Sequence, residues 1–345
     1  MIKLAFFDTK PYDRIWFDKL NDFCEITYFE EKLNKHTAKL TEGFDAACAF
    51  VNDDICAAAV ERMEKNGIKL LAMRCAGYSN VDIHAANGRL HVVRVPAYSP
   101  HAVAEFAAAL LLTLDRRLHK AYNRTRDFNF NINGLTGTDL YGKTAGIIGT
   151  GKIGQIFAKI CTGFGMDVLA YDLYPNESSG LKYVELNELF EKSDVISLHC
   201  PLTQSTRHIL DENAFSRMKT GVFVINTSRG ALIDSSALLS ALSSGRIAGA
   251  GLDVYEEEAD VFYEDKSDTV ERDRTLSLLL GHPNVLLTSH QAFLTNEALS
   301  NIADVTLQNI REFFQKDMLQ NEVCYDCATR SIHDSCRRKR GEGCR

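Results

Sequence analysis

The stretch TAGIIGTGKIG, residues 144–154, decides the fold of this chain. Its apolar start has the length of a buried strand, and the residues that follow it have the periodicity of a helix. Between them, Gly149 permits a tight turn, Gly151 lets the backbone approach a pyrophosphate, and Gly154 lets helix and strand pack closely. The N-terminus of the helix would direct its positive dipole end at the phosphates. This order of elements predicts a dinucleotide site.

The next apolar run, MDVLAYD, ends in Asp172, eighteen residues after Gly154. A carboxylate at the end of that strand can accept hydrogen bonds from the ribose hydroxyls of a dinucleotide. The residues that follow, Leu173 to Pro175, include no arginine for a 2′-phosphate. We therefore expect NAD rather than NADP. The alternative is a glycine-rich turn that binds no ligand.

Apolar runs of strand length recur along the chain, separated by segments of helix length. Before Pro100 they are IKLAFFD, CEITYFE, AACAFV, KLLAMRC and LHVVRVP, and after it TAGIIG, MDVLAYD, VISLHC, GVFVINTS, AGAGLDV and NVLLTSH. This alternation predicts an α/β fold with two Rossmann-like, doubly wound parallel-sheet domains. Ser99 and Pro100 open an apolar run that we interpret as one long, largely buried helix reaching Tyr122.

The chain has 345 residues, more than a single hydrophobic core usually serves. We expect an NAD-binding domain over 100–296 and a discontinuous substrate domain over 1–99 and 297–323. The helix from about Leu294 is followed by no further strand, so in the simplest topology it packs against the first domain. The active site would then lie in the cleft between the domains.

Composition argues against nucleic acid and membrane partners. The net charge is −7 and hydrophobic residues make up 45% of the chain, as in a globular protein that binds a small molecule. The longest apolar stretch, Ala102 to Leu114, is shorter than a membrane span, and the N-terminal residues do not have the pattern of a secretory signal. The expected location is the cytoplasm.

The ten cysteines fall into two groups. Six are scattered through apolar segments, where cysteine usually acts as a small buried hydrophobe. The other four, Cys324, Cys327, Cys336 and Cys344, lie in a basic tail over 324–345. A zinc site there is conceivable, but the second pair lacks the short spacing of structural zinc sites. We favour a disordered or artefactual extension, and expect no metal.

Three charged or ionisable positions each follow a strand of the second half. Arg229 in NTSRGALID could bind a carboxylate or cap a surface turn. One of the glutamates at 256–258 could enter a cleft, although most glutamate runs are solvated. His290 in SHQAFLT could donate a proton or simply end a strand. Together at one sheet edge, these residue types meet the needs of 2-oxo acid reduction: a cation, a proton donor and a carboxylate to orient the donor.

At this point the chain resembles the NAD-dependent D-2-hydroxyacid dehydrogenases, most closely their bacterial fermentative D-lactate branch. The likeness runs from Met1 to about Val323 and includes RCAGYSNVD, RVPAYSP, DVISLHCPLT, NTSRGALIDS, LDVYEEE and SHQAFLTNEAL. It implies that Arg229 binds the substrate carboxylate, His290 donates the proton, and Glu258 pairs with the histidine. The implied reaction is NADH-dependent reduction of pyruvate to D-lactate. The open alternatives are a bulkier 2-oxo acid such as phenylpyruvate, and an NAD-sensing, corepressor-like binding protein.

The resemblance also implies the remaining contacts and the assembly. The cofactor would be bound by Gly149, Gly151, Lys152, Ile153, Gly154, Asp172, Cys200, Pro201, Thr206, Thr227, Ser228, Arg229 and Asp253. The substrate would be bound by Ala76, Gly77, Tyr98 and Arg229, with Phe50 and Phe293 shaping its pocket. A homodimer or homotetramer, formed through the cofactor domain and its long helix, is the expected assembly.

Overall fold

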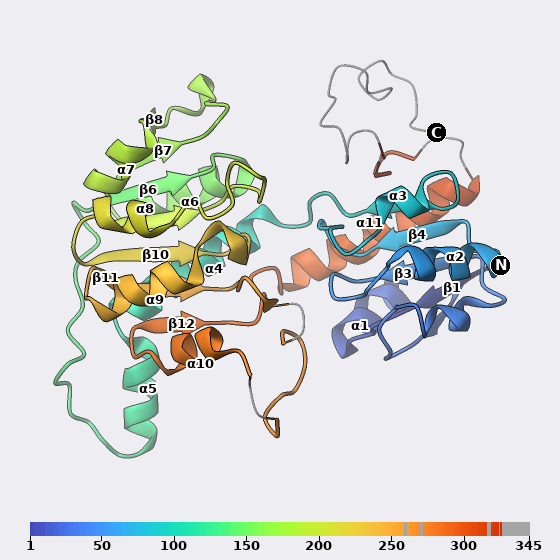
Figure 1. The fold of residues 1–345 in the computed structure, drawn as a ribbon, viewed down its shortest axis with the longest axis horizontal. Helices are drawn as coiled ribbons and strands as arrows, with labels where there is room; N and C mark the ends of the chain where they lie inside the picture. Colours follow the sequence, from blue (N-terminus) through green and yellow to red (C-terminus); the bar gives the residue numbers. More distant parts are fainter. Residues whose placement is uncertain (259–260, 270–271, 316–318, 324, 326–345) are drawn as a thin grey trace. The chain divides into compact units, whose positions relative to one another are not determined.

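A computed structural model describes residues 1–258, 261–269, 272–315, 319–323 and 325. The chain divides into two compact units (Figure 1). Unit 1 combines Met1–Ser99 with the described residues from Thr295 onward, and unit 2 is Pro100–Leu294. The tail positions 326–345 and Cys324, on which the conceivable zinc site depends, lie outside the described residues.

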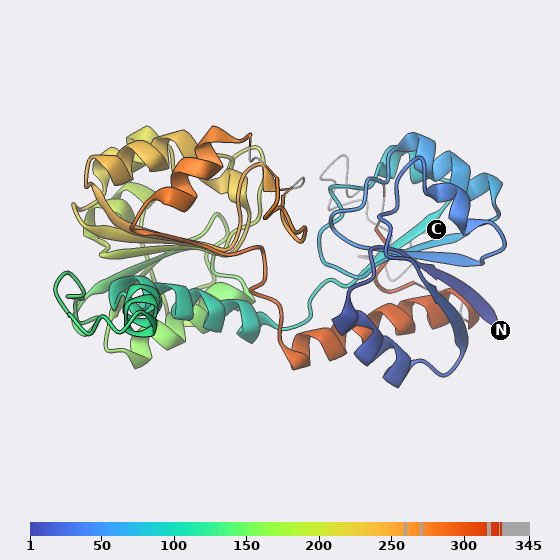
Figure 2. The same ribbon diagram turned by 90° about the horizontal axis from the view of Figure 1, so that it is seen from below.

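Unit 1 is built on a five-stranded sheet in the order β2-β1-β3-β4-β5, with every pairing parallel. Its strands are β1 (Ile2–Phe6), β2 (Cys24–Tyr28), β3 (Ala46–Ala49), β4 (Leu70–Met73) and β5 (His91–Arg94). Its helices are α1 (Pro11–Leu20), η1 (Ala38–Thr41), α2 (Ala57–Lys65), α3 (Ile83–Ala86) and α11 (Asn296–Gln315). Successive side chains of each strand point to opposite faces of the sheet. α1 and α11 cover one face, and α2 and α3 cover the other (Figure 2).

Unit 2 is built on a seven-stranded parallel sheet in the order β12-β11-β10-β9-β6-β7-β8. Its strands are β6 (Thr144–Ile148), β7 (Asp167–Tyr171), β8 (Lys182–Tyr183), β9 (Val195–Leu198), β10 (Val222–Asn226), β11 (Ile247–Leu252) and β12 (Val285–Leu287). The strand order reverses between β6 and β9, which is where doubly wound sheets bind ligands. The predicted fold class, α/β with two parallel sheets, is confirmed.

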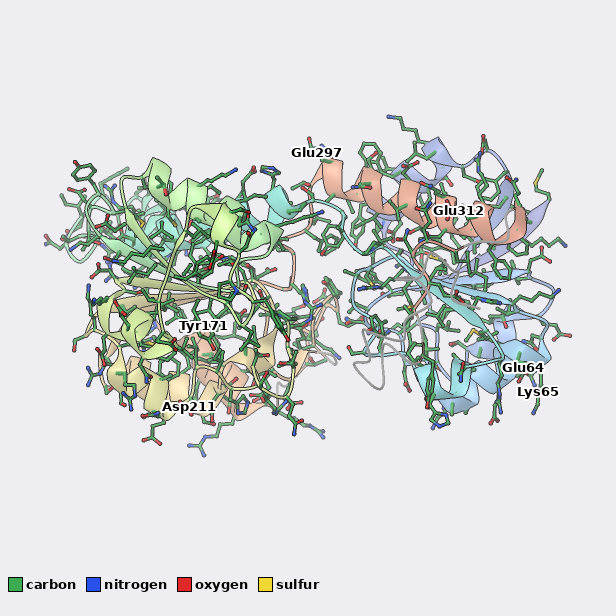
Figure 3. The ribbon with its side chains drawn as sticks, turned by 90° about the horizontal axis from the view of Figure 1, so that it is seen from above. Glu64, Lys65, Tyr171, Asp211, Glu297 and Glu312 are labelled. Carbon is green, nitrogen blue, oxygen red and sulfur yellow. The ribbon has the colours of Figure 1, made fainter. Side chains whose placement is uncertain are left out.

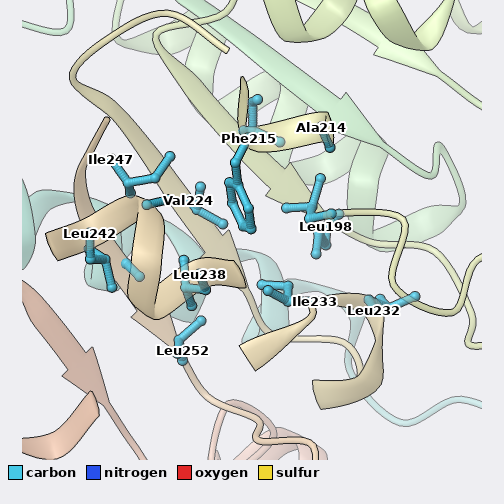
Figure 4. Close-up of a cluster of buried hydrophobic side chains, with 14 of the residues drawn as sticks. Leu198, Ala214, Phe215, Val224, Leu232, Ile233, Leu238, Leu242, Ile247 and Leu252 are labelled. Carbon is cyan, nitrogen blue, oxygen red and sulfur yellow. The ribbon is translucent and has the colours of Figure 1, made fainter. Parts of the chain in front are cut away.

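Helices cover both faces of the second sheet. They are α4 (Pro100–Asp115), α5 (Leu118–Arg126), α6 (Lys152–Gly163), η2 (Glu177–Ser179), α7 (Leu186–Lys192), α8 (Glu212–Arg217), η3 (Gly230–Leu232), α9 (Ser235–Ser243) and α10 (Arg274–Gly281). α4 and α6 pack on one face. On the other, Figure 4 shows Leu198, Val224 and Leu252 of β9 to β11 packing with Phe215 of α8 and Leu238 of α9. These buried layers fix the strand ends that carry the site.

The expected single helix from Pro100 to Tyr122 is wrong, because the chain forms two helices that break at Arg117. That residue has φ 50, in the left-handed region that interrupts a right-handed helix. α4 is largely buried, whereas none of the α5 residues is. The apolar run ends at Leu114, so there is no hydrophobic stripe to hold the continuation against the sheet. In the described part of the chain, no helix has the length and apolar character to cross a membrane.

Candidate active site

The glycine loop after β6 has the geometry of a phosphate cradle. Gly149 has φ 94, and a Cβ added there would lie 2.5 Å from the backbone nitrogen of Cys200. A Cβ at Gly154 would lie 2.0 Å from the carbonyl oxygen of Gly149. A Cβ at Gly151, by contrast, would meet nothing within 4 Å. Two glycines therefore close the turn, and the third leaves open space before the N-terminus of α6, as an anionic ligand requires.

Asp172 lies directly after Tyr171, the last residue of β7, which Figure 3 labels. Its Oδ2 accepts hydrogen bonds from the backbone nitrogen of Thr150 (2.6 Å) and from the Thr150 hydroxyl (2.9 Å). Burial opposes ionisation, but hydrogen bonds from the backbones of Thr150 and Tyr174 outweigh it and lower the pKa of Asp172. The carboxylate is thus ionised and able to accept hydrogen bonds from ribose hydroxyls. Sequence reasoning missed Tyr183, whose hydroxyl donates to Thr150 Oγ1 at 2.9 Å.

The loops after β9 and β10 contribute the other expected cofactor positions. Thr206 Oγ1 donates to the carbonyl of Pro201 at 2.7 Å and so closes the first loop. Burial raises the pKa of the Cys200 thiol to about 11, so the thiol is neutral near neutral pH. Ser228 Oγ donates to the carbonyl of Leu198 at 2.8 Å. Thr227 Oγ1 is buried, and no described residue forms a hydrogen bond with it, so this hydroxyl could bond to the cofactor.

Glu258 and His290 form a close pair. Glu258 Oε1 lies 2.7 Å from His290 Nδ1, and both side chains are about one-fifth exposed (23% and 20%). The second carboxylate oxygen, Oε2, accepts from the backbone nitrogen of Tyr255 at 2.9 Å, which fixes the carboxylate plane. Of the other two glutamates, Glu256 bonds to His208 Nε2 at 2.7 Å and Glu257 is exposed. The structure thus brings only Glu258 of the three against the histidine.

Arg229 is exposed, and its Nη1 donates to the carbonyl of Ser228 at 2.6 Å. The next residue, Gly230, packs against the loop that carries Glu258. A Cβ added at Gly230 would lie 2.0 Å from the carbonyl carbon of Tyr255 and 2.3 Å from the nitrogen of Glu256. The arginine loop and the glutamate loop are therefore in backbone contact. Because β10, β11 and β12 are neighbours, the residues that follow them share one sheet edge.

Asp253 follows β11 and is fully buried (0% exposed). Its Oδ1 accepts from Thr288 Oγ1 (2.6 Å) and from the backbone nitrogen of Gln291 (2.9 Å), and its Oδ2 accepts from the nitrogen of Ala292 (2.8 Å). The carboxylate therefore holds the loop that carries His290. The sequence predicted a cofactor contact here; its role in the loop is visible only in the structure.

The expected substrate residues of unit 1 lie at the ends of β3, β4 and β5. The Phe50 ring is buried against the guanidinium of Arg74, 4.6 Å away. The carbonyl of Ala76 accepts from Arg94 Nη1 at 2.7 Å, and the carbonyl of Tyr98 accepts from Asn301 at 2.6 Å. The carbonyl of Gly77 accepts from the Cys75 thiol at 3.2 Å. Phe293 is buried in unit 2, and its place beside the substrate, like theirs, stays a prediction.

Comparison with known proteins identifies the family. Residues 108–292 match the family described as "D-isomer specific 2-hydroxyacid dehydrogenase, NAD binding domain". The chain is also 50% identical over 328 residues to the D-lactate dehydrogenase of Escherichia coli, covering 93% of this chain and all of that protein. The chain belongs to the D-isomer specific 2-hydroxyacid dehydrogenases. The predicted family and the NAD cofactor are thereby confirmed.

Solved structures of relatives have the same fold as this dehydrogenase. The apo-structure of D-lactate dehydrogenase from Escherichia coli matches with a TM-score of 0.86 at 48% identity, over 93% of this chain and 100% of that one. The structure of D-lactate dehydrogenase with NAD⁺ from Lactobacillus jensenii matches with a TM-score of 0.78 at 29% identity, over 93% of this chain and 99% of that one.

Among the described residues of this chain, no three or more histidine, cysteine or acidic side chains are arranged so that they could hold a metal ion.

Proposed function

We propose that this chain is a D-lactate dehydrogenase that reversibly reduces pyruvate with NADH. The observation that carries the proposal is the 2.7 Å contact between Glu258 and His290, at the same sheet edge as Arg229. NADH, when bound, supplies the hydride that reaches the keto carbon of pyruvate. The chain must then bind the carboxylate and deliver a proton to the carbonyl oxygen.

Each of these tasks falls to one side chain. The Arg229 guanidinium can bind the substrate carboxylate through two parallel hydrogen bonds and polarise the carbonyl beside it. His290 Nδ1 is directed at Glu258, so the proton for the substrate leaves from the other ring nitrogen, Nε2. The Glu258 carboxylate stabilises the positive charge on the imidazole before transfer and keeps Nδ1 protonated afterwards.

Replacing His290 by glutamine tests the proposal. We expect His290→Gln to lose turnover of pyruvate by at least about a hundredfold while its dissociation constant for NADH stays unchanged. His208→Gln is the matched control, since His208 also pairs with a glutamate at 2.7 Å in unit 2 but has no proposed role in the reaction. Full turnover by His290→Gln would refute the assignment of the proton donor.

A panel of 2-oxo acids tests the substrate. The pocket that we expect Phe50 and Phe293 to line suits the methyl group of pyruvate. Steady-state rates with NADH should give a higher kcat/KM for pyruvate than for phenylpyruvate. A higher kcat/KM for phenylpyruvate would make the bulkier acid the substrate. Equal rates of pyruvate reduction with NADPH and NADH would contradict the proposed contact of Asp172 with the ribose hydroxyls.

We also propose that the chain assembles into a homodimer or homotetramer through unit 2. Large apolar side chains stand exposed on α5 and in the segment after it: Leu118, Tyr122, Phe128, Phe130 and Ile132. A patch of this kind is typical of a surface that a second subunit covers. Sedimentation velocity of wild type and of Phe130→Asp should show an oligomer that the substitution weakens; a monomeric wild type would contradict this assembly.

The cytoplasm stays the predicted compartment. The six cysteines at 24, 48, 56, 75, 161 and 200 are all free thiols, and three of them are buried. Free thiols persist in a reducing compartment, where a pyruvate reductase would also find NADH. Fractionation of cells that produce the protein would test this expectation.

A further inference from the structure

His290 has a backbone conformation that its neighbours must maintain. Its φ of 52 lies in the left-handed region, which residues with a Cβ rarely occupy. Such a residue relaxes toward ordinary angles unless surrounding contacts hold it, and the relaxation would swing the Cα–Cβ bond that aims the imidazole. What holds the backbone of His290 therefore also sets the direction of the proposed proton donor.

Three hydrogen bonds hold His290, and each acts on a different atom. Its backbone nitrogen donates to the carbonyl of Asp253 at 2.7 Å. Its ring Nδ1 lies 2.7 Å from Glu258. Its carbonyl oxygen accepts from the hydroxyl of Tyr263, again at 2.7 Å, and the two rings lie 6.4 Å apart. The Tyr263 bond restrains the carbonyl end of the peptide on the C-terminal side of the histidine, and the bond from the Gln291 nitrogen to Asp253 Oδ1 (2.9 Å) restrains its other end.

Tyr263 and Glu258 are five positions apart in the sequence, and backbone hydrogen bonds tie the residues before Tyr263 to Glu258. The backbone nitrogen of Phe262 donates to the carbonyl of Glu258 at 2.9 Å, and the Phe262 ring is buried in the core of unit 2. Tyr263 has φ 68, so it too is held in the left-handed region. Glu258 thus bonds to the ring of the histidine through a carboxylate, and Tyr263 bonds to its backbone through a phenol.

We propose that Tyr263 is a positioning residue for the proton donor. Its hydroxyl holds the His290 carbonyl, and thereby keeps the imidazole of His290 on the Glu258 carboxylate. The Glu258 carboxylate is itself held by the Tyr255 nitrogen and can follow a displaced ring only partly, whereas the Tyr263 hydroxyl bonds to the His290 backbone directly. This inference rests on the proposed role of His290 in the reaction.

Tyr263→Phe is the direct test, because it removes one oxygen atom and keeps the ring. We expect kcat/KM for pyruvate to fall by about tenfold, the value of one hydrogen bond in rate. We expect the dissociation constant for NADH to stay unchanged, since the glycine loop follows a different strand. The loss should fall on kcat and leave KM nearly unchanged, because a misaligned donor slows proton delivery while Arg229 still binds the substrate.

The matched control is Tyr28→Phe. The Tyr28 hydroxyl donates to Asp18 at 2.7 Å in unit 1, so the substitution deletes the same atom and a bond of equal length far along the chain. We expect its kcat and KM to match those of the wild type. Thermal unfolding of both variants shows whether each is folded.

A double mutant separates positioning from general destabilisation. If Tyr263 acts through the contact between His290 and Glu258, Tyr263→Phe added to Glu258→Gln should lower kcat/KM by much less than tenfold. A loss that falls on KM with kcat unchanged, or full additivity in the double mutant, would overturn the inference. So would a Tyr263→Phe enzyme that behaves as wild type while His290→Gln is inactive. Full turnover by His290→Gln would instead defeat the proposed function itself.

Discussion

Asp253→Asn tests whether the loop that carries His290 is held by a buried carboxylate. The Asp253 side chain is fully buried and accepts three hydrogen bonds from residues 288–292: two on Oδ1 and one on Oδ2. Asparagine has almost the same shape, but one of its two terminal groups is a donor. The substitution therefore changes the hydrogen bonding of this loop with little change in volume.

The magnitude follows from counting donors. If the amide nitrogen occupies the Oδ2 position, it faces the backbone N–H of Ala292; at the Oδ1 position it faces that of Gln291. In either case one buried N–H loses its acceptor, which costs about 1–3 kcal/mol, and the remaining bonds lose the charge that strengthens them. Burial raises the pKa of Asp253, so removing the charge returns part of this cost. We expect a net loss of about 2 kcal/mol in the free energy of unfolding.

Two measurements distinguish a role of Asp253 in holding the loop from a role in binding the cofactor. Urea unfolding should show the loss of stability, and steady-state assays should show a kcat/KM for pyruvate about 10- to 100-fold lower because His290 is displaced. Asp211→Ala is the control: Asp211 caps α8 through the nitrogen of Ala214, so only stability should fall. A variant with wild-type stability and kcat/KM would refute this role, and a variant that lost only NADH affinity would make Asp253 a cofactor contact instead.

Other perturbations have equally definite outcomes. Gly230→Ala places a methyl group 2.0 Å from the Tyr255 backbone, so we expect Arg229 to be displaced and kcat/KM for pyruvate to fall about a hundredfold. The methyl group of Gly163→Ala would meet nothing within 4 Å, and this variant should be neutral in the same assay. Burial raises the pKa of Asp53 to about 7, so ionisation of Asp53 disfavours folding. The stability that this side chain contributes is present below about pH 4 and is lost as the pH rises through 7. In chemical denaturation, the free energy of unfolding of wild type should fall by about 2 kcal/mol relative to Asp53→Asn between about pH 5 and pH 8. A chain that ends at Val323 should keep its activity and unfolding temperature, because the Val323 N–H already donates to β5; loss of either would show that the tail contributes to the fold.

The parts of the site that the sequence predicted depend on local sterics and on topology. Gly149 and Gly154 are required because the backbone comes within 2.5 Å of where a Cβ would be, and that demand appears in the sequence as a glycine spacing. Arg229 follows β10 and His290 follows β12, and both strands run parallel to β11 between them, so their shared edge follows from the alternation of strands and helices. Neither inference needs the packing of side chains.

The parts that residue patterns alone left open depend on contacts between distant residues. Three adjacent glutamates look alike in sequence, and the resemblance alone pointed to Glu258; tertiary packing directs Glu256 to His208 and Glu258 to His290. The break between α4 and α5 lies at Arg117, whose left-handed backbone conformation no residue pattern around it predicted. Tyr263 is one tyrosine among twelve, and nothing in its neighbours along the chain marks a bond to a carbonyl 27 residues away.

The two units are expected to contribute differently to the reaction. Within unit 2, the glycine loop, Asp172 and the histidine pair all follow strands at one sheet edge, and backbone hydrogen bonds hold the carboxylates of Asp172 and Glu258. The substrate residues predicted on unit 1 are instead the backbone at Ala76 and Gly77, the Phe50 ring and Tyr98. None of them has a part in the transfer of the hydride or the proton in the proposed reaction. Substitutions in unit 1 should therefore change the preference among 2-oxo acids, whereas those at the edge of unit 2 should change the rate of the chemical step.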